Sequence, residues 1–330
     1  MERREDNLKD KYVVGIDLGG TKICAAVVNF MGQVICKATL PTEAEKGENF
    51  ILNRMIEIIE KVIEECKVDR KAIVGVGIGS PGPLNIDKGE IICTPNLPFR
   101  NFNIVKPIKD NFKIPVYLDN DANAAALGEY MFGSGKDSEN MVFITVSTGI
   151  GGGAILNGRI YRGNTKNALE VGHMTLEKEG PLCNCGNYGC AEVLASGTAI
   201  AREAKKAVKT GECTSLSKYK NITSKEVFKE AELGDGVSKN ILDIALNYLG
   251  ICVANVVTCF DPEVVVIGGG VSKGGSIVLS KVKQVVKKRC FQSISENTKI
   301  LSALLGEDSG AIGAAALAIR HFQRNNKSVC

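Results

Sequence analysis

Two kinds of hydrophobic pattern alternate along the chain. Residues 13–28 and 141–156 each contain two apolar runs separated by a short glycine-containing turn, which is the pattern of a β-hairpin. Residues 49–66 instead carry apolar side chains at helical spacing with charged residues opposite, so we expect a helix packed on a sheet. Hairpins, strands and helices in this succession indicate an α/β fold.

The same patterns predict the remaining elements. Residues 116–130 change from a strand into an alanine-rich helix, and residues 237–260 form a long apolar helix. Polar residues interrupt that helix, which therefore belongs in a protein core rather than a membrane. Residues 73–83 should form a strand that ends in a small-residue loop, and residues 263–270 a second strand. We also expect helices at residues 198–208, at 224–232 with a cap at Ser224, and at 306–322.

The turn of the first hairpin has the composition of a phosphate-binding tip. Gly19 and Gly20 allow a close backbone approach, and Thr21 and Lys22 add donors. Asp17, just before the turn, could hold Mg²⁺ through water. An ordinary hairpin would show the same pattern, so this tip alone leaves both interpretations open.

The second hairpin repeats this plan about 130 residues later. Thr148, Gly149 and Gly151 occupy its tip, and two such units suggest a duplicated domain. The two tips would then face opposite ends of one polyphosphate, with the active site in the cleft between the halves. A third glycine segment, Gly268–Gly270, follows a buried strand and suits a nucleoside lying on bare backbone.

Asp121 is the candidate general base. It lies where the predicted strand ends and the alanine-rich helix begins, the position at which catalytic groups of open α/β sheets usually lie. A helix N-cap would explain Asn120 or Asp121 equally well if the phosphate hairpins were absent. With the hairpins, we expect the Asp121 carboxylate to accept the proton of a sugar hydroxyl as its oxygen attacks a γ-phosphate.

Two further positions carry weaker signals for substrate binding. Ser80 lies in a small-residue loop that leaves room for a ligand, although a plain turn would look the same. Asn96 is the one polar side chain with reach in an irregular, proline-bounded segment, and it is a candidate partner for a sugar hydroxyl.

Three of the twelve cysteines, Cys183, Cys185 and Cys190, fall within eight residues. With His173 they make a Cys3His set, which completes a tetrahedral Zn²⁺ shell and leaves no position for a catalytic water, so the metal would be structural. Reduced thiols in a glycine-rich loop are the alternative. Glu170 and Glu192 flank this segment, so a metal-bound loop would hold both carboxylates near the imidazole.

Composition excludes several classes of protein. The chain has 330 residues, 44% of them hydrophobic and 24% charged, as in a globular protein. Its net charge of +4 is not concentrated in a basic stripe, so we expect no nucleic-acid partner. The first residues lack a signal-peptide core, and the cysteines outside the cluster are scattered among apolar runs, so we expect a cytoplasmic protein without a membrane segment.

These motifs together resemble the ROK family of sugar kinases and repressors, and most closely its bacterial glucokinases. The resemblance runs from about residue 13 to about residue 315. Its motifs are DLGGT at 17–21, LDNDANAAALGE at 118–129, STGIGGG at 147–153, EVGHM at 170–174 and CNCGNYGCAE at 183–192. The last is the most specific, because hexokinases outside the family lack it. Phe99 departs from relatives that often have Trp after the NLP motif.

The resemblance implies an actin-like ATPase fold of the ribonuclease H-like type, with ATP and Mg²⁺ between two α/β domains and D-glucose deeper in the cleft. It implies a small domain of residues 1–122 plus about 308–330, and a large domain of residues 123–307. By similarity Asp121 is the base for the 6-hydroxyl, and Asn120, Glu170, His173 and Glu192 bind the sugar. A homodimer or homotetramer is expected.

The resemblance leaves the substrate and the class of protein to be decided. Glu170, His173 and Glu192 make a polar wall suited to glucose hydroxyls, while kinases for N-acetylmannosamine, fructose or allose would use similar phosphate loops. Polyphosphate could replace ATP as donor. Family repressors carry a helix-turn-helix ahead of the first phosphate motif, and only sixteen residues precede Asp17, so we expect an enzyme rather than a DNA-binding sensor. The second histidine, His321, is expected at the surface.

Overall fold

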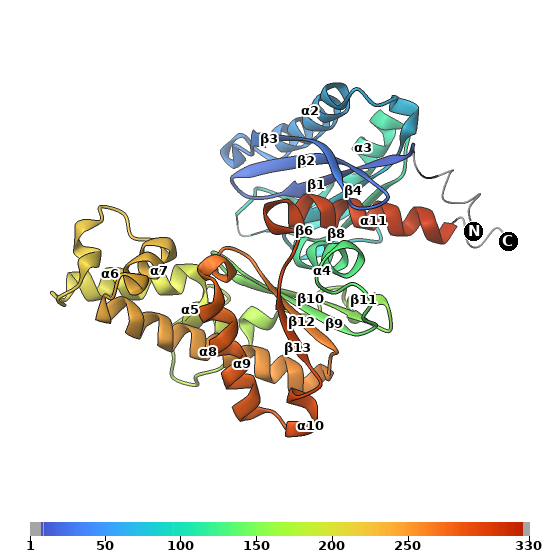
Figure 1. Cartoon of the computed structure of the whole chain (residues 1–330). Helices are drawn as coiled ribbons and strands as arrows, with labels where there is room; N and C mark the ends of the chain where they lie inside the picture. Colours follow the sequence, from blue (N-terminus) through green and yellow to red (C-terminus); the bar gives the residue numbers. More distant parts are fainter. Residues whose placement is uncertain (1–7, 9, 95, 326–330) are drawn as a thin grey trace.

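The computed structural model describes residues 8, 10–94 and 96–325. Two five-stranded sheets form the centres of its two halves, with a pair of helices between them (Figure 1). The first sheet consists, in spatial order, of β3 (Val34–Pro41), β2 (Lys22–Asn29), β1 (Tyr12–Leu18), β4 (Ile73–Ser80) and β8 (Val116–Asn120).

The second sheet repeats the order of the first. It consists of β11 (Arg159–Tyr161), β10 (Ile150–Leu156), β9 (Met141–Val146), β12 (Val264–Gly268) and β13 (Lys299–Ser302). In each sheet the first three strands in sequence are antiparallel neighbours, and the last two run parallel to the first. The two predicted hairpins are therefore present in equivalent places, and the predicted duplication of an α/β unit is confirmed.

Both sheets are covered on both faces, which explains their nearly continuous apolar strands. In the second sheet Val264 and Val266 pack towards one helix layer, while the alternating Val265 and Ile267 pack towards the other. The first sheet has α2 (Glu48–Cys66) and α3 (Val105–Phe112) over one face. The apolar stripe of α2 was predicted from residues 49–66, and its buried residues are those at helical spacing.

Two helices fill the space between the halves. α4 (Asp121–Phe132) packs mainly on the second sheet, and α11 (Ser309–Asn325) packs on the open face of the first sheet and against α4. α11 lies very close to β1 and β4, because a Cβ at Gly15 would meet the Ala311 carbonyl oxygen and one at Gly77 the Ala314 carbonyl oxygen. The predicted domain boundaries, 1–122 with 308–330 and 123–307, stay a prediction.

Each half also carries an insertion. A small three-stranded sheet of β5 (Leu84–Asn85), β6 (Glu90–Cys93) and β7 (Arg100–Asn103) lies between β4 and α3 in the sequence. In the second half the insertion follows β11, and it contains the cysteine-rich loop with α5 (Ala191–Ala195), α6 (Gly197–Lys209) and α7 (Ser224–Glu232). The other helices of that half are α8 (Gly236–Phe260), α9 (Ser276–Arg289) and α10 (Gln292–Ser295).

Some boundaries differ from the predictions. The strand expected to reach residue 270 ends at Gly268, and the last helix begins at Ser309 after one 3-10 turn rather than at residue 306. α7 is capped by Thr223 and not by Ser224, because the Thr223 hydroxyl and the Glu226 carboxylate complete a capping box. Ser224 is the first residue inside the helix.

α8 is the one helix of the described chain that is long and apolar enough to cross a membrane by length and composition alone. However, 61% of its most apolar stretch is buried inside the protein, as in a core helix. Leu242, Leu249 and Val253 are among its residues in the core of the second half.

Candidate active site and metal centre

A cavity of about 610 Å³ opens between the two halves. The first hairpin, α4 and the second sheet all contribute to its wall. Residues on this wall include Asp17, Lys22, Asp121, Ser147, Gly269 and Gly270. Residues more than 250 positions apart in the sequence thus face one space, as the predicted cleft requires.

Three consecutive polar residues at the end of β8 have three different roles. Asp119 is buried, and its carboxylate accepts hydrogen bonds from the Asn120 amide and the Asn123 side chain. Asn120 is the N-cap of α4, where its Oδ1 accepts from the amides of Ala122 and Asn123. Since Asn120 caps the helix, Asp121 is not needed for that purpose and its carboxylate faces the cavity.

Asp119 ties this strand end to the second half. Arg162, just after β11, donates from Nε at 2.8 Å and from Nη2 at 2.6 Å to the Asp119 carboxylate. Neither residue was predicted to be important from the sequence. The interpretation of this strand end rested on Asn120 and Asp121, and nothing local in the sequence predicts that Asp119 has a partner 43 residues away.

Asp121 lies at the electrostatic centre of the site. Solvent reaches its side chain through the cavity, but protein surrounds it on most sides, so burial raises its pKa while the amides of Ala122 and of Asp121 itself oppose the rise. A raised pKa makes a carboxylate a better proton acceptor near neutral pH. Burial is the main cause of the raised pKa of Asp17 and of Glu170, and the Asp121 charge raises both further, so Asp121 lies close to both carboxyl groups.

Asp17 ends its strand beside the cavity. Burial, followed by the charge of Asp121, raises the pKa of Asp17 to about 6, and Lys22 opposes the rise. A divalent cation between two such carboxylates would relieve their repulsion. The residues present therefore fit the Mg²⁺ that the motif predicts.

Backbone hydrogen bonds fix the conformation of the first hairpin tip, residues 19–22. The Gly19 amide donates to the Lys22 carbonyl, and the Thr21 carbonyl accepts from the Thr42 amide. Lys22 lines the cavity. Asn96 packs against this tip, since a Cβ on Gly20 would lie 3.1 Å from the Asn96 Cβ.

The second hairpin tip is tied to one of the predicted sugar-binding residues. The Glu192 carboxylate accepts from the Ile150 amide at 3.0 Å, and a Cβ on Gly149 would meet it. Thr148 is exposed at the tip, whereas Gly151 lies within β10, packed close to Thr145 and the first turn of α4. Gly151 therefore gives room for α4 to approach the sheet.

Of the three glycines at the end of β12, two face the cavity. Gly269 and Gly270 line it, and a Cβ on Gly269 would meet the Val146 carbonyl oxygen. Gly268 lies inside the strand, buried, with the Phe143 ring occupying the place of a side chain. The position of Gly268 corresponds to strand packing, while the other two leave bare backbone at the wall.

Some residues on the wall of the central cavity were not predicted from the sequence. Ser302, Gly306, Glu307 and Gly310 line the cavity, and a Cβ on Gly310 would meet the Asp17 carboxylate. The GEDSG run at residues 306–310 is the only local signal, and it was interpreted as the start of a helix.

Ser80 and Asn120 end neighbouring strands, where they are directly paired. Ser80 is fully buried, and its hydroxyl donates to the Pro81 carbonyl at 3.1 Å. Because the Asn120 oxygen caps α4, the amide group of that side chain is what remains for a ligand. The substrate-binding roles of both residues stay predictions.

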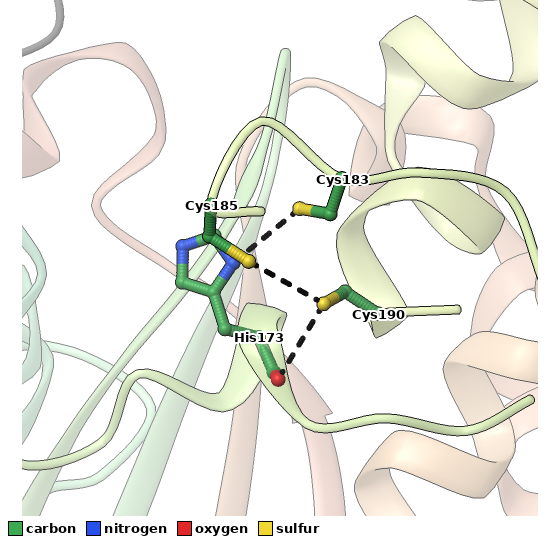
Figure 2. Close-up of side chains that lie close together, drawn as sticks. All are labelled: His173, Cys183, Cys185 and Cys190. Atoms are coloured by element: carbon green, nitrogen blue, oxygen red, sulfur yellow. Dashed lines mark hydrogen bonds between the residues drawn. The ribbon is translucent and has the colours of Figure 1, made fainter. Parts of the chain in front are cut away.

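The structure brings the predicted zinc ligands together (Figure 2). One ligand atom from each of His173, Cys183, Cys185 and Cys190 lies within 4.8 Å of the others. The Cys183 sulfur is 3.7 Å from His173 Nδ1, and the sulfurs of Cys185 and Cys190 are 3.7 Å apart. His173 comes from a 3-10 turn that begins directly after Glu170, so the cluster and the carboxylate share one short segment.

The chemistry of this cluster fits a cation. Burial raises the pKa of Cys183 and raises that of Cys190 to about 12, whereas the Asn187 amide lowers that of Cys185 to about 7. Zn²⁺ would offset the cost of burying thiolates, since coordination deprotonates them. In Figure 2 the imidazole turns Nδ1 towards the thiols and its other nitrogen away from them, which leaves Nε2 available to a ligand.

Comparison with known proteins gives a consistent result. A glucokinase of Halalkalibacterium halodurans is 36% identical over 94% of this chain and 96% of its own length. A ROK family glucokinase of Streptomyces griseus, solved in complex with glucose and AMPPNP, has a TM-score of 0.80 and 30% identity over 94% of this chain and 99% of its own. A xylose repressor of Caldicellulosiruptor bescii is 34% identical over 93% of this chain and 78% of its own.

The similarity to solved ROK structures confirms the actin-like ATPase fold expected from the motifs. The ROK family description matches residues 13–321, which is nearly the whole described chain. By this match and by the identity to its relatives, the chain belongs to the ROK family.

Proposed function

We propose that this protein is an ATP-dependent sugar kinase that transfers the γ-phosphoryl group of MgATP to the 6-hydroxyl of D-glucose, in the cytoplasm. The position of Asp121 carries the proposal. Its carboxylate lines the cavity and lies close enough to Asp17, beside the first phosphate tip, and to Glu170, beside the cysteine cluster, for its charge to act on both. A base that joins a phosphate site to a sugar site is what phosphoryl transfer to a hydroxyl requires. Glucokinases among the relatives support the same activity.

The residues of the cavity divide the work of holding the nucleotide. The Gly19–Gly20 backbone and the Lys22 ammonium would bind the terminal phosphates from one side, and the Ser147–Gly149 turn from the other. Gly269 and Gly270 leave backbone against which the nucleoside lies. Asp17 would hold Mg²⁺ through water, and when bound the ion neutralises charge on the phosphates.

The acceptor hydroxyl would meet Asp121. Its carboxylate accepts the hydroxyl proton as the oxygen forms its bond to the γ-phosphorus and the bond from that phosphorus to the β-bridging oxygen breaks. Asn120 keeps the helix start in place through its cap, so the carboxylate is fixed relative to the strand end. The proton is then held by the Asp121 carboxyl group, and ADP carries the negative charge of the leaving oxygen.

Glucose is the sugar that the flanking residues favour. Glu170 and Glu192 are acceptors for two hydroxyl groups, and His173 Nε2 supplies a further polar contact. Bound Zn²⁺ would fix the tautomer and orientation of that imidazole and would leave Asp121 unaffected. An acetamido group needs apolar space, so N-acetylmannosamine is the weaker candidate, together with fructose and allose.

The test is a coupled assay of ADP formation from MgATP against glucose, N-acetylmannosamine, N-acetylglucosamine, fructose and allose, with zinc measured on the same sample. We expect glucose to have the highest kcat/KM and about one zinc per chain, as a Cys3His site requires. A different sugar clearly ahead would contradict the choice of glucose but keep the kinase. Replacing ATP by polyphosphate in a parallel series tests the donor.

A sugar sensor is the second candidate, because xylose repressors are among the relatives. For a sensor we expect a sugar to bind in calorimetry, while none of the five sugars is phosphorylated with ATP or polyphosphate as donor. Turnover of glucose at enzyme-like rates would contradict it.

A further inference from the structure

Away from the active site, five basic residues surround a second, smaller cavity. It has a volume of about 170 Å³ and lies where β11, α4 and the last turns of α11 meet. Four guanidinium groups and one imidazole line it, with Leu127, Ile160 and Leu317 as the apolar remainder. The basic residues are Arg159, Arg162, Arg320, His321 and Arg324.

These cations come from separate segments that the fold brings together. Arg159 and Arg162 belong to β11 and the residue after it, whereas the other three belong to the end of α11. Burial lowers the pKa of Arg320, and the nearby Arg324 and Arg159 lower it further. Burial also lowers the pKa of His321, and the charges of Arg162 and Arg324 lower it further. The cluster is thus a place of like-charge repulsion in a partly buried setting.

The fold holds the central members of this cluster in fixed positions. Arg320 donates to the Gly158 carbonyl and lies over the Tyr130 ring, and His321 stacks on Tyr117 with ring centroids 4.1 Å apart. His321 is therefore half-buried, and the expectation that it would be a surface residue was wrong. Side chains held in this way are preorganised for a ligand, which costs less entropy on binding.

Acidic groups compensate only part of this charge. Among the described residues that line the cavity none is acidic. Asp119 pairs with Arg162 at 2.6 Å, whereas Arg159 and Arg320 have no acidic partner within the part of the chain that the structure describes. Clefts lined by one sign of charge concentrate counter-ions of the opposite sign.

We propose that this cavity is a binding site for a small oxyanion, either inorganic phosphate or the phosphoryl group of a small phosphorylated metabolite. Arginine is the side chain best suited to phosphate, because its planar fork donates two parallel hydrogen bonds. The volume is below the roughly 300–1,000 Å³ of pockets for drug-sized ligands, so this cavity by itself suits an ion or a single phosphoryl group.

A neighbouring cavity gives a metabolite room for its remaining atoms. It has a volume of about 370 Å³ and shares Arg162, Leu317 and His321 with the first. Its other charged lining residues are Lys88 and Lys166, with Asp87 and Asp119. Arg162 also holds Asp119, two residues before Asp121, so an anion here shares a residue with the strand end that carries the proposed base. This site is distinct from the phosphate tips and does not depend on the proposed function.

The experiment is a calorimetric titration of the whole chain with inorganic phosphate and, separately, with 3-phosphoglycerate, both at ionic strength matched with sodium chloride. We expect saturable binding of phosphate with a Kd below about 10 mM. Arg159→Gln removes one fork from the cavity, and we expect it to weaken binding by about tenfold. Tighter binding of 3-phosphoglycerate than of phosphate would identify a phosphorylated metabolite as the ligand, and the reverse order would identify phosphate itself.

Arg289→Gln is the matched control, because it removes the same charge from the exposed last turn of α9. Equal phosphate affinity in the Arg159→Gln and Arg289→Gln proteins would overturn the proposal, since any binding would then occur elsewhere, including the active-site cleft. So would the absence of saturable binding in the wild type. If thermal melting shows that Arg159→Gln is not folded, Arg159→Lys, which keeps the charge but removes the planar fork, tests the same position, and we again expect weaker phosphate binding than in the wild type.

Discussion

The two halves of the molecule share a strand order but differ in what is inserted into it. Both sheets have three antiparallel strands followed by two parallel ones, and each presents the turn of its first hairpin to the central cavity. The first half inserts a small three-stranded sheet, whereas the second inserts the loop with His173 and the three cysteines. The shared part thus accounts for a phosphate cleft, and the predicted sugar contacts come mostly from the insertion of the second half.

The two hairpin tips also differ in how they meet a ligand. The first places charged side chains, Asp17 and Lys22, on the cavity wall. The second places Ser147 there, and the amide of Ile150, where β10 begins, donates to the Glu192 carboxylate. A duplicated scaffold can therefore hold the charged end of a ligand with one copy and connect the other copy to the acceptor site. Four tests of this division follow, in order of expected effect.

The largest effect is expected for Asp121→Asn, at the junction of the halves. The amide cannot accept the hydroxyl proton, so we expect kcat to fall by about 10²–10⁴ while calorimetric sugar binding persists. The exposed Asp110→Asn in α3 is the control and should turn over normally. Near-normal turnover by Asp121→Asn would remove the assigned base.

Gly77→Ala tests how closely α11 must lie on the first sheet. Its Cβ would come within 1.8 Å of the Ala314 carbonyl oxygen, so we expect the free energy of unfolding to fall by about 3 kcal/mol or more in denaturant titrations. Gly153→Ala is the equivalent test of α4 on the second sheet, and its Cβ would come within 2.7 Å of the Ala122 carbonyl oxygen, so a smaller loss is expected.

Gly236→Ala provides the control for both variants. A Cβ there has no neighbour within 4 Å, and the change should leave stability within about 0.5 kcal/mol of the wild type. Equal losses for Gly77→Ala and Gly153→Ala would mean that the two helix contacts are equally tight.

Cys185→Ser tests whether the insertion of the second half serves the sugar alone. We expect loss of zinc and a 10- to 100-fold rise in the KM for sugar, because His173 loses its orientation, with little change in the KM for ATP. The exposed Cys213→Ser is the control for thiol removal. Full zinc content in the Cys185→Ser protein would contradict the proposed ligand set.

The smallest effect concerns Asp17 and the stability of the first half. Because its pKa is raised from 3.8 to about 6, the folded state binds this proton more tightly than the unfolded state. The contribution of Asp17 to stability therefore falls as pH rises from about 4 to about 6, and above pH 6 the ionised group costs about 1–3 kcal/mol.

Asp17→Asn should accordingly be the more stable protein at pH 8, with the difference shrinking towards pH 4. Denaturant unfolding of both proteins across this range measures it. A difference that does not vary with pH would show that something other than the buried carboxylate is responsible.

Sequence patterns predicted the local parts of this structure well. The helical spacing of residues 49–66 and the hairpins around Gly19 and Gly149 depend on neighbours within a few positions, and all are present. The Cys3His cluster was predictable for the same reason, since its ligands lie within eighteen residues. The roles assigned to individual site residues remain predictions.

Contacts between distant segments were not predictable in this way. The pairing of Asp119 with Arg162 and the contact of Gly310 with Asp17 join elements whose order in space comes from the whole fold. Asn120 and Asp121 are equally good caps by type, and only the structure shows that Asn120 takes that role. Hydrophobic periodicity describes which face of an element is buried, and it does not say which partner covers it.

The contact of α11 with the first sheet has a consequence for how the protein is made. Val13, Ala26 and Val28 are covered by α11, although they leave the ribosome long before that helix does. During translation the first sheet keeps one apolar face uncovered until α11 has emerged, and such surfaces are the ones that chaperones bind. A messenger truncated before codon 309 would yield a chain that never covers this face and is exposed to proteases from the start.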